Sequence, residues 1–294
     1  MAHAPELLAF DPAFQRRLRA LSLASRRLVH AAAVCGQHRS RNLGPGSEFA
    51  DYREYSAGDD YRHIDWNAYA RSERLLVRLH EQESELSVHV LLDCSGSMAD
   101  KLGYGLQLTA AIAYVALSHL ERLTICAVRD RIAAQVGPLR GLARAAEVLD
   151  FLRGLRAEGH TALAPAARAF AAQQPRRGMA ILISDLYDPN GALEALDVLR
   201  HARFDVRVIR VLAAAELEPD YSGELELVDA ETGRRRRMQI TPRVLEAYRA
   251  ARRREADALR HACLARHVPL TVLDPRIAPE DAVLRLLRQA GMFR

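Results

Sequence analysis

Cysteine is scarce in this chain, and the few that are present are scattered. The four cysteines, at positions 35, 94, 126 and 263, form no Cys-x-x-Cys pair and have no histidine at zinc-site spacing. This pattern argues against a disulfide framework and against a structural zinc site. Reduced thiols are typical of a cytoplasmic protein.

Long hydrophobic runs are also missing. No apolar stretch approaches the ~18–20 residues that a membrane-spanning helix needs. The N-terminal sequence MAHAPELLAFDPAF lacks the basic-then-apolar layout of a signal peptide. We therefore expect no transmembrane segment and a cytoplasmic location.

Lysine is almost absent, because Lys101 is the only one among the 42 basic residues. We attribute this skew, together with the many alanines, to a GC-rich genome. The net charge is a mild +5. Two arginine runs, 234–237 and 252–254, could meet phosphates, but no aromatic residues or reading motif accompany them. Nucleic-acid binding is therefore the least favoured function, and both runs are interpreted as solvated faces.

Familiar catalytic motifs are missing as well. The chain has no G-x-x-x-x-G-K-[ST] phosphate loop and no G-x-S-x-G hydrolase elbow, since Met98 and Ala99 follow Ser97. The D-x-D of haloacid dehalogenase phosphatases lacks its second acid, because Ser95 stands there. We expect no enzymatic activity, and keep a metal-dependent hydrolase or phosphatase as the alternative.

From residue 86 onward the chain alternates between apolar strand patterns and helical patterns. This alternation predicts a doubly wound α/β domain with a mostly parallel, Rossmann-like sheet covered on both faces. A tight turn at Arg129–Asp130 predicts one antiparallel strand pair. A β-hairpin is expected near 222–240, inserted into a domain that spans 85–294.

The N-terminal part, 1–84, is expected to form a helical and irregular appendage. Residues 11–33 carry leucines at helical spacing with arginines opposite them, which predicts an amphipathic helix. Residues 49–73 are densely polar and aromatic, with a turn at Gly58–Asp60 that precedes a short helix through Trp66. We interpret this segment as a structural lock, in which arginines and carboxylates pair while the aromatic rings pack the appendage onto the sheet, and keep a partner-binding surface as the alternative.

Polar side chains gather where the predicted strands end. Asp93 ends one buried strand and Asp185 ends another, and the carboxyl ends of strands are where such sheets bind ligands. The other oxygen donors of this edge lie in D-x-S-x-S and in the 156–163 loop: Ser95, Ser97 and Thr161. These five hard oxygen donors favour Mg²⁺ or Mn²⁺.

Each of these residues also has an ordinary structural interpretation. Asp93, Ser95, Ser97 and Thr161 could cap the helices that follow them, and Asp185 could stabilise a turn. The metal site is favoured because all five side chains fall where one switch point would gather them.

Asp93-Cys94-Ser95-Gly96-Ser97, Thr161 and Asp185 together resemble the metal-ion-dependent adhesion site of the von Willebrand factor type A family. The resemblance covers roughly 85–290. It implies a sheet with one antiparallel edge strand and direct metal ligation by Ser95 and Ser97. Asp93, Thr161 and Asp185 would act directly or through water.

The segment Tyr55-x-x-Gly58-Asp59-Asp60-x-Arg62-x-Ile64-Asp65-Trp66 resembles the signature of the bacterial domain of unknown function 58 family. That resemblance implies a chaperone-like adaptor or assembly factor that works with a MoxR-type AAA+ ATPase. We expect a divalent-metal-dependent protein interaction module, in which a partner supplies a Glu or Asp to the metal.

Overall fold

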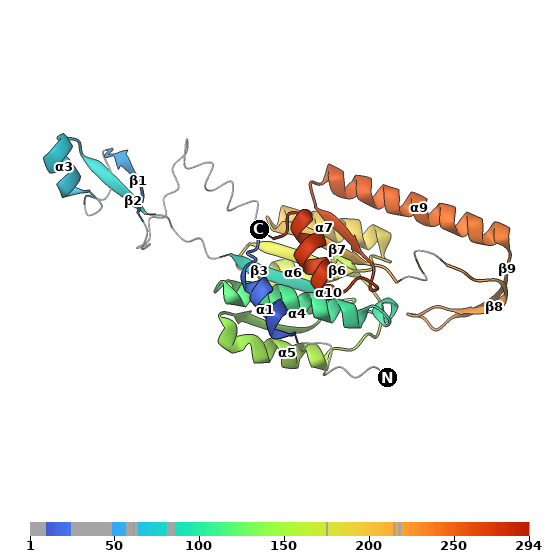
Figure 1. The fold of residues 1–294 in the computed structure, drawn as a ribbon. Coiled ribbons are helices and arrows are strands. Elements are labelled where there is room, and N and C mark those ends of the chain that lie inside the picture. Colours follow the sequence, from blue (N-terminus) through green and yellow to red (C-terminus); the bar gives the residue numbers. More distant parts are fainter. Residues whose placement is uncertain are drawn as a thin grey trace. The chain divides into compact units, whose positions relative to one another are not determined.

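The chain divides into two units in the computed structural model, each with its own helices and strands (Figure 1). The larger unit comprises Met1–Ser25 and Leu86–Arg294, and the smaller comprises Arg26–Glu85. The structure describes residues 10–24, 49–56, 61, 64–80, 86–174, 176–213, 216 and 219–293.

A six-stranded sheet forms the centre of the larger unit, with strand order β10-β7-β6-β3-β4-β5. Every neighbouring pair is parallel except β4 and β5. The strands are β3 (Ser87–Asp93), β4 (Arg122–Val128), β5 (Ile132–Leu139), β6 (Met179–Ser184), β7 (Asp205–Val211) and β10 (Leu270–Leu273). The predicted mostly parallel α/β sheet with an antiparallel strand pair is confirmed.

The two strands at the middle of the sheet are buried along their whole length. Their sequences, SVHVLLD in β3 and MAILIS in β6, are nearly continuous apolar runs, as expected for parallel strands covered on both faces. The chain leaves β3 toward β4 on one side and later returns to β6 on the other. The carboxyl ends of β3 and β6 therefore flank the topological switch point.

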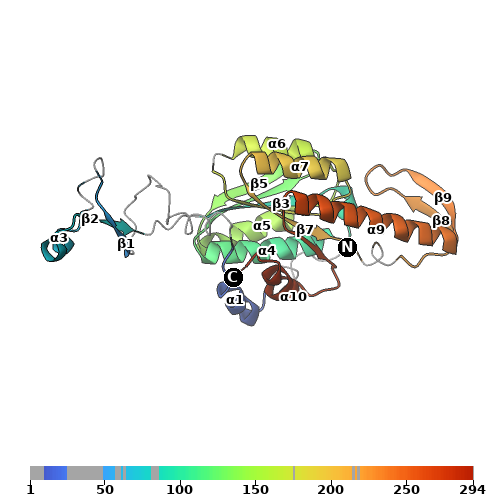
Figure 2. The same ribbon diagram turned by 90° about the horizontal axis from the view of Figure 1, so that it is seen from above.

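Helices cover both faces of this sheet (Figure 2). Helices α4 and α5 lie on one face, and α6 and α7 lie on the other. Phe170 of α6, Leu196 of α7 and Leu259 of α9 share one buried cluster. The bounds are α4 (Leu102–Ser118), α5 (Ala145–Gly154), α6 (Leu163–Gln173), α7 (Pro189–His201) and α9 (Pro242–Ala265). Along the described part of the chain, no helix combines the length and apolarity needed to cross a bilayer.

The N-terminal helix is shorter than predicted and packs with the larger unit. Helix α1 spans Pro12–Arg19, while residues 25–33 lie outside the described residues. Phe14 and Leu18 are buried, and Arg19 Nε donates to the Tyr114 hydroxyl of α4 at 2.8 Å. Grouping this helix with the appendage was therefore wrong, because its apolar face is buried in the larger unit.

The C-terminal third adds a hairpin and a short helical end. Strands β8 (Gly223–Val228) and β9 (Arg235–Ile240) pair antiparallel with each other, apart from the six-stranded sheet. Helix α9 and strand β10 follow. The last turns are α10 (Pro279–Asp281) and the π-helical η5 (Ala282–Leu287).

The smaller unit contains β1 (Phe49–Glu54), α3 (Trp66–Ser72) and β2 (Leu76–His80). The two strands pair antiparallel, and β1 was not predicted. Helix α3 begins at Trp66 and is capped by Asp65, so the predicted helix leading up to Trp66 was wrong. Residues 57–60, where the turn was placed, lie outside the described residues.

Candidate metal site at the carboxyl edge of the sheet

Three of the predicted ligands lie at the end of β3 and in the turn that follows it. Asp93 is the last residue of the strand, and Ser95 and Ser97 lie in the turn into the 3₁₀ helix η3 (Gly96–Met98). Gly96 allows this turn to approach the loop before α6, since its amide donates to the Gly159 carbonyl at 2.9 Å. A Cβ at position 96 would lie 2.7 Å from the Ala230 carbonyl oxygen, which leaves no room for a side chain.

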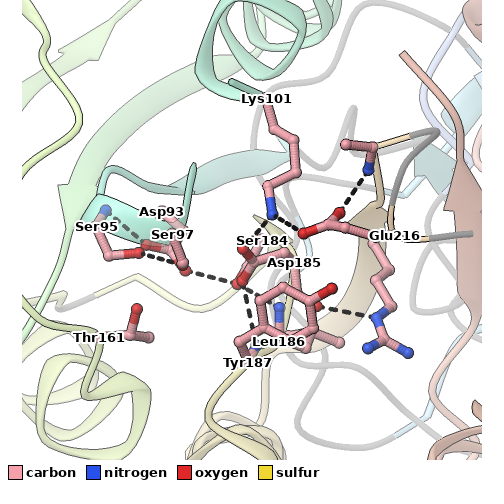
Figure 3. A network of polar contacts seen from close by, with 12 residues as sticks. Asp93, Ser95, Ser97, Lys101, Thr161, Ser184, Asp185, Leu186, Tyr187 and Glu216 are labelled. Atoms are coloured by element: carbon pink, nitrogen blue, oxygen red, sulfur yellow. Dashed lines mark hydrogen bonds and ion pairs between the residues drawn. The ribbon is translucent and has the colours of Figure 1, made fainter. Parts of the chain in front are cut away.

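Asp93 is held by hydrogen bonds rather than by an opposite charge (Figure 3). Its Oδ1 accepts from the Ser95 amide at 2.9 Å, and its Oδ2 accepts from the Ser184 hydroxyl at 2.6 Å. Among the described residues none forms an ion pair with Asp93, whose side chain is fully buried. Burial raises the pKa of Asp93 to about 6, although the hydrogen bonds from Ser184 and Ser95 oppose this shift.

The two serine hydroxyls converge, with their Oγ atoms 3.1 Å apart. Neither takes the helix-capping role that the alternative interpretation gave it. The Ser95 side chain makes no capping bond at η3, and the N-cap position of α4 is Lys101 rather than Ser97. The N-cap position of α6 is Ala162, again without a side-chain cap, so Thr161 does not cap that helix. These hydroxyls are therefore oriented by something other than helix capping.

Asp185 has a cationic partner inside the protein. Lys101 Nζ lies 2.7 Å from Asp185 Oδ2 and 2.8 Å from Glu216 Oε1, and the lysine side chain is only 2% exposed. Asp185 Oδ1 accepts from the Tyr187 amide at 3.1 Å, which stabilises the turn after β6 as one interpretation proposed. The Tyr187 ring lies 4.8 Å from the ammonium.

Figure 3 shows Thr161 below Ser95 and Ser97 in that view, and the hydrogen bonds of Thr161 lead to the hairpin between β8 and β9. The Thr161 hydroxyl donates to Glu231 Oε1 at 2.7 Å, and the Thr161 amide donates to Glu231 Oε2 at 3.2 Å. Glu231 belongs to the turn between β8 and β9. A loop before α6 and a hairpin turn 70 residues later thus meet at this edge of the sheet.

The donor set fits a hard divalent cation bound through few charges. In the described ranges, no three His, Cys, Asp or Glu side chains gather closely enough to hold a metal. A metal here would depend on the Ser95, Ser97 and Thr161 hydroxyls beside Asp93, while Lys101 neutralises Asp185. Hydroxyl and carboxylate oxygens suit Mg²⁺ or Mn²⁺, and the low charge favours weak binding.

Four residues of this network were not among the predicted ligands: Lys101, Ser184, Glu216 and Glu231. The sequence did carry a signal for one of them. Lys101 is the only lysine in a chain that otherwise uses arginine, and it lies four residues after Ser97. The role of Glu231 had no such signal, because its contact joins loops far apart in sequence.

The basic runs have partners of their own. Arg235 lies 3.2 Å from Glu226 across the hairpin. Arg252 lies 2.9 Å from Glu255 and donates to the Tyr187 hydroxyl at 2.9 Å. These contacts explain part of the arginine content without invoking a nucleic acid.

Proteins of similar sequence include three from mycobacteria. Uncharacterized proteins of Mycobacterium bovis and Mycobacterium tuberculosis are 30% identical to this chain over 280 residues, covering 88% of the chain and 86% of theirs. Such similarity over most of both chains indicates a shared fold.

Two solved structures cover 70% of this chain and 98% of their own chains. One is the conserved hypothetical protein BatB from Bacteroides thetaiotaomicron, with a TM-score of 0.40 and 14% identity. The other is an aerotolerance-related membrane protein from Bacteroides fragilis carrying multiple mutations to serines, with a TM-score of 0.39 and 15% identity. The family model described as protein of unknown function DUF58 matches residues 51–258, and the chain belongs to this family.

Proposed function

We propose that the chain is a divalent-metal-dependent protein interaction module of the von Willebrand factor type A kind. Mg²⁺ or Mn²⁺ would be held by the residues of the metal-ion-dependent adhesion motif: Asp93, Ser95, Ser97, Thr161 and Asp185. A partner protein would supply a further carboxylate. The resemblance of the motif and the α/β sheet with its switch point support this proposal.

The state of Asp93 is the observation that carries the proposal. A buried carboxylate without an opposite charge is costly, and its pKa is raised accordingly. Two converging hydroxyls lie directly beside it in the turn after β3. A small hard cation at this place would compensate the charge and use the hydroxyl oxygens as ligands.

The residues of the chain have separate tasks at this site. The Ser184 hydroxyl and the Ser95 amide fix the orientation of Asp93. Ser95 and Ser97 offer oxygen without adding charge, so the site keeps a net attraction for an outside anion. A bound Mg²⁺ supplies a positive centre that attracts a hard anionic oxygen, and a Glu or Asp side chain of a partner provides one.

The partner we propose is a MoxR-type AAA+ ATPase, or a client protein presented by it. This choice rests on the family resemblance. The module itself would act as an adaptor or assembly factor. Metal and partner would each raise the affinity of the other, as thermodynamic linkage requires.

A pull-down of the ATPase encoded by the same genome tests this proposal. We expect wild type to retain the ATPase in Mg²⁺ and to release it in EDTA. Asp93→Asn should abolish retention, because it removes the carboxylate beside the metal while keeping its shape. Asp257→Asn, on the exposed face of α9, is the matched control and should bind as wild type does. Undiminished retention in EDTA would overturn metal dependence.

A further inference from the structure

The turn of the β8–β9 hairpin lies on the candidate metal site. Its Glu231 carboxylate receives two hydrogen bonds from Thr161, one from the hydroxyl and one from the amide. The backbone of the same turn lies against the turn after β3, since a Cβ at Gly96 would be 2.7 Å from the Ala230 oxygen. Residues 229–233, here called the hairpin turn, therefore cover the loops that carry Ser97 and Thr161.

The hairpin turn is shaped to present Glu231. Asp229 Oδ1 accepts from the Glu231 amide at 3.1 Å and from the amide and hydroxyl of Thr232 at 2.6 and 2.7 Å. The Gly233 amide donates to the Asp229 carbonyl at 2.9 Å, and Gly233 has φ +67°, which favours glycine. The backbone around Glu231 is thus fixed, and its side chain points to Thr161.

Glu231 is held without a strong cationic partner. Its side chain is 23% exposed, and among the described residues its closest basic group is His160 Nδ1 at 3.7 Å. No arginine or lysine of the described chain lies within ion-pairing distance of it. A half-buried carboxylate that accepts from the Thr161 hydroxyl is the kind of group that a divalent ion at this site would attract.

The direction of the Thr161 hydrogen bond leaves room for a cation beside its hydroxyl oxygen. A threonine hydroxyl has one proton and two lone pairs. The Thr161 proton points to Glu231, so its lone pairs stay available to a cation on the side of Ser95 and Ser97. Glu231 therefore lies next to the position of a bound ion, where an outside carboxylate would also have to enter.

We propose that Glu231 is a built-in carboxylate ligand that occupies the place of the partner's carboxylate until a partner displaces it. This inference rests on the proposed metal-dependent function. The partner would then bind through an acidic turn of its own, similar in chemistry to Asp229-Ala-Glu-Thr-Gly233 of this chain. The arginines of 234–237, exposed next to this turn, add attraction for further carboxylates of such a segment.

The hairpin can leave the site at low structural cost. Strands β8 and β9 form a separate two-stranded sheet, so moving them breaks no hydrogen bond of the six-stranded sheet. Such a hairpin is marginally stable by itself. Displacement therefore requires breaking the Thr161–Glu231 contacts and the packing at Gly96, rather than unfolding the domain.

The first test counts water on bound Mn²⁺ by water-proton relaxation, with Mn²⁺ affinity measured by calorimetry. Full-length Glu231→Gln should bind Mn²⁺ but show more exchangeable water, because one carboxylate ligand is lost. Glu226→Gln, on the same hairpin and paired with Arg235, is the matched control and should behave as wild type.

Asp93→Asn distinguishes a failure of the proposed metal site from a failure of Glu231 as its built-in ligand. If Asp93→Asn binds Mn²⁺ as wild type does, the metal site and the inference that rests on it both fail. If Asp93→Asn loses Mn²⁺ while Glu231→Gln keeps the wild-type water count, only the built-in ligand is overturned. A higher water count in Glu231→Gln alone supports it.

The second test supplies the hairpin turn from outside. The probe is a cyclised, fluorescent peptide with the sequence of residues 223–240. In wild type the internal Glu231 competes at high effective concentration, so full-length Glu231→Ala should bind the peptide about tenfold more tightly or better. The gain should vanish in EDTA and with a peptide carrying Gln at the Glu231 position. Equal binding by both proteins would overturn the inference.

Discussion

Lys101 brings a protonated amine into a site whose other groups are oxygen atoms. It is buried between the Asp185 and Glu216 carboxylates and the Tyr187 ring. The compact ammonium of lysine can donate to both carboxylates, whereas the planar guanidinium of arginine has a fixed fork of donors. This difference gives a physical reason for one lysine in a chain that otherwise uses arginine.

Replacing Lys101 with methionine should destabilise the protein and strengthen metal binding. The substitution leaves Asp185 buried without its partner charge, which costs about 3–5 kcal/mol. It also frees a second carboxylate for a divalent ion. Thermal unfolding with and without Mn²⁺ should show a lower melting temperature for Lys101→Met, and a larger upward shift with Mn²⁺ than in wild type.

Arg260→Met provides the control for this measurement. Arg260 pairs with Asp257 on an exposed face of α9, where removal of an ion pair costs roughly 0–1 kcal/mol. Its melting temperature should stay close to that of wild type, with the same Mn²⁺ shift. An Mn²⁺ shift in Lys101→Met no larger than in wild type would contradict competition between Lys101 and the metal.

At the scale of single elements, α3 depends on the residue before it. Asp65 is 3% exposed and accepts from the Asn67 and Ala68 amides at 2.9 and 3.1 Å, and from the Tyr52 hydroxyl at 2.6 Å. Trp66 is 60% exposed within the smaller unit and contacts Tyr69 edge to face. Within the smaller unit Trp66 is not packed, and Asp65 takes the structural role; the predicted packing of the aromatic rings onto the sheet stays a prediction.

Substitutions at these two neighbours should differ in effect. Asp65→Ala removes a helix cap and leaves the Tyr52 hydroxyl without this acceptor, which costs roughly 1–3 kcal/mol. Trp66→Ala, at an exposed position, should cost less than about 1 kcal/mol. Hydrogen exchange of the amides of α3 measures both. Faster exchange in Trp66→Ala than in Asp65→Ala would contradict this assignment.

For the larger unit as a whole, two buried groups make stability depend on pH in opposite directions. Burial lowers the pKa of His89 to about 4, with Phe170 and Phe204 packed against its ring and the Arg177 charge nearby. Burial raises the pKa of Asp93 to about 6. The fold thus disfavours the charged form of each group.

Because the unfolded chain binds a proton at His89 below about pH 6.5, the free energy of unfolding should fall as pH drops from 6.5 to 4. The total loss from this residue is roughly 3 kcal/mol. The contribution of Asp93 to the free energy of unfolding has the opposite sign. Between pH 6 and 3.8 the folded state binds a proton that the unfolded chain does not, so this contribution rises as pH falls. It therefore offsets much of the histidine effect in wild type.

The difference between wild type and His89→Phe isolates the histidine. His89 and Asp93 are four residues apart on β3, on the order of 13 Å, so their contributions should add. Denaturant unfolding between pH 4 and 7 should show wild type losing stability relative to His89→Phe as pH falls. A difference that is constant with pH would contradict a neutral, buried His89 in the folded state.

The strand–helix alternation of the larger unit could be predicted because each apolar run is long enough to show its period. The same holds for the antiparallel pair of β4 and β5, whose turn is local. The helix bounds near the N-terminus could not be predicted, because α1 ends at Arg19 although its leucine spacing continues. Its packing on α4 is a contact across about 95 residues that no local pattern encodes.

The sequence by itself determined where the oxygen donors lie along the chain, because strand ends and D-x-S-x-S are local patterns and parallel strands bring their carboxyl ends to one edge. The tertiary structure alone decided which hydrogen-bond and ion-pair partners those donors have. Asp93 is left to hydrogen bonds, Asp185 is neutralised by Lys101, and Thr161 is joined to Glu231. These pairings depend on how distant loops pack at the switch point, and their energies depend on burial, which sequence spacing does not define.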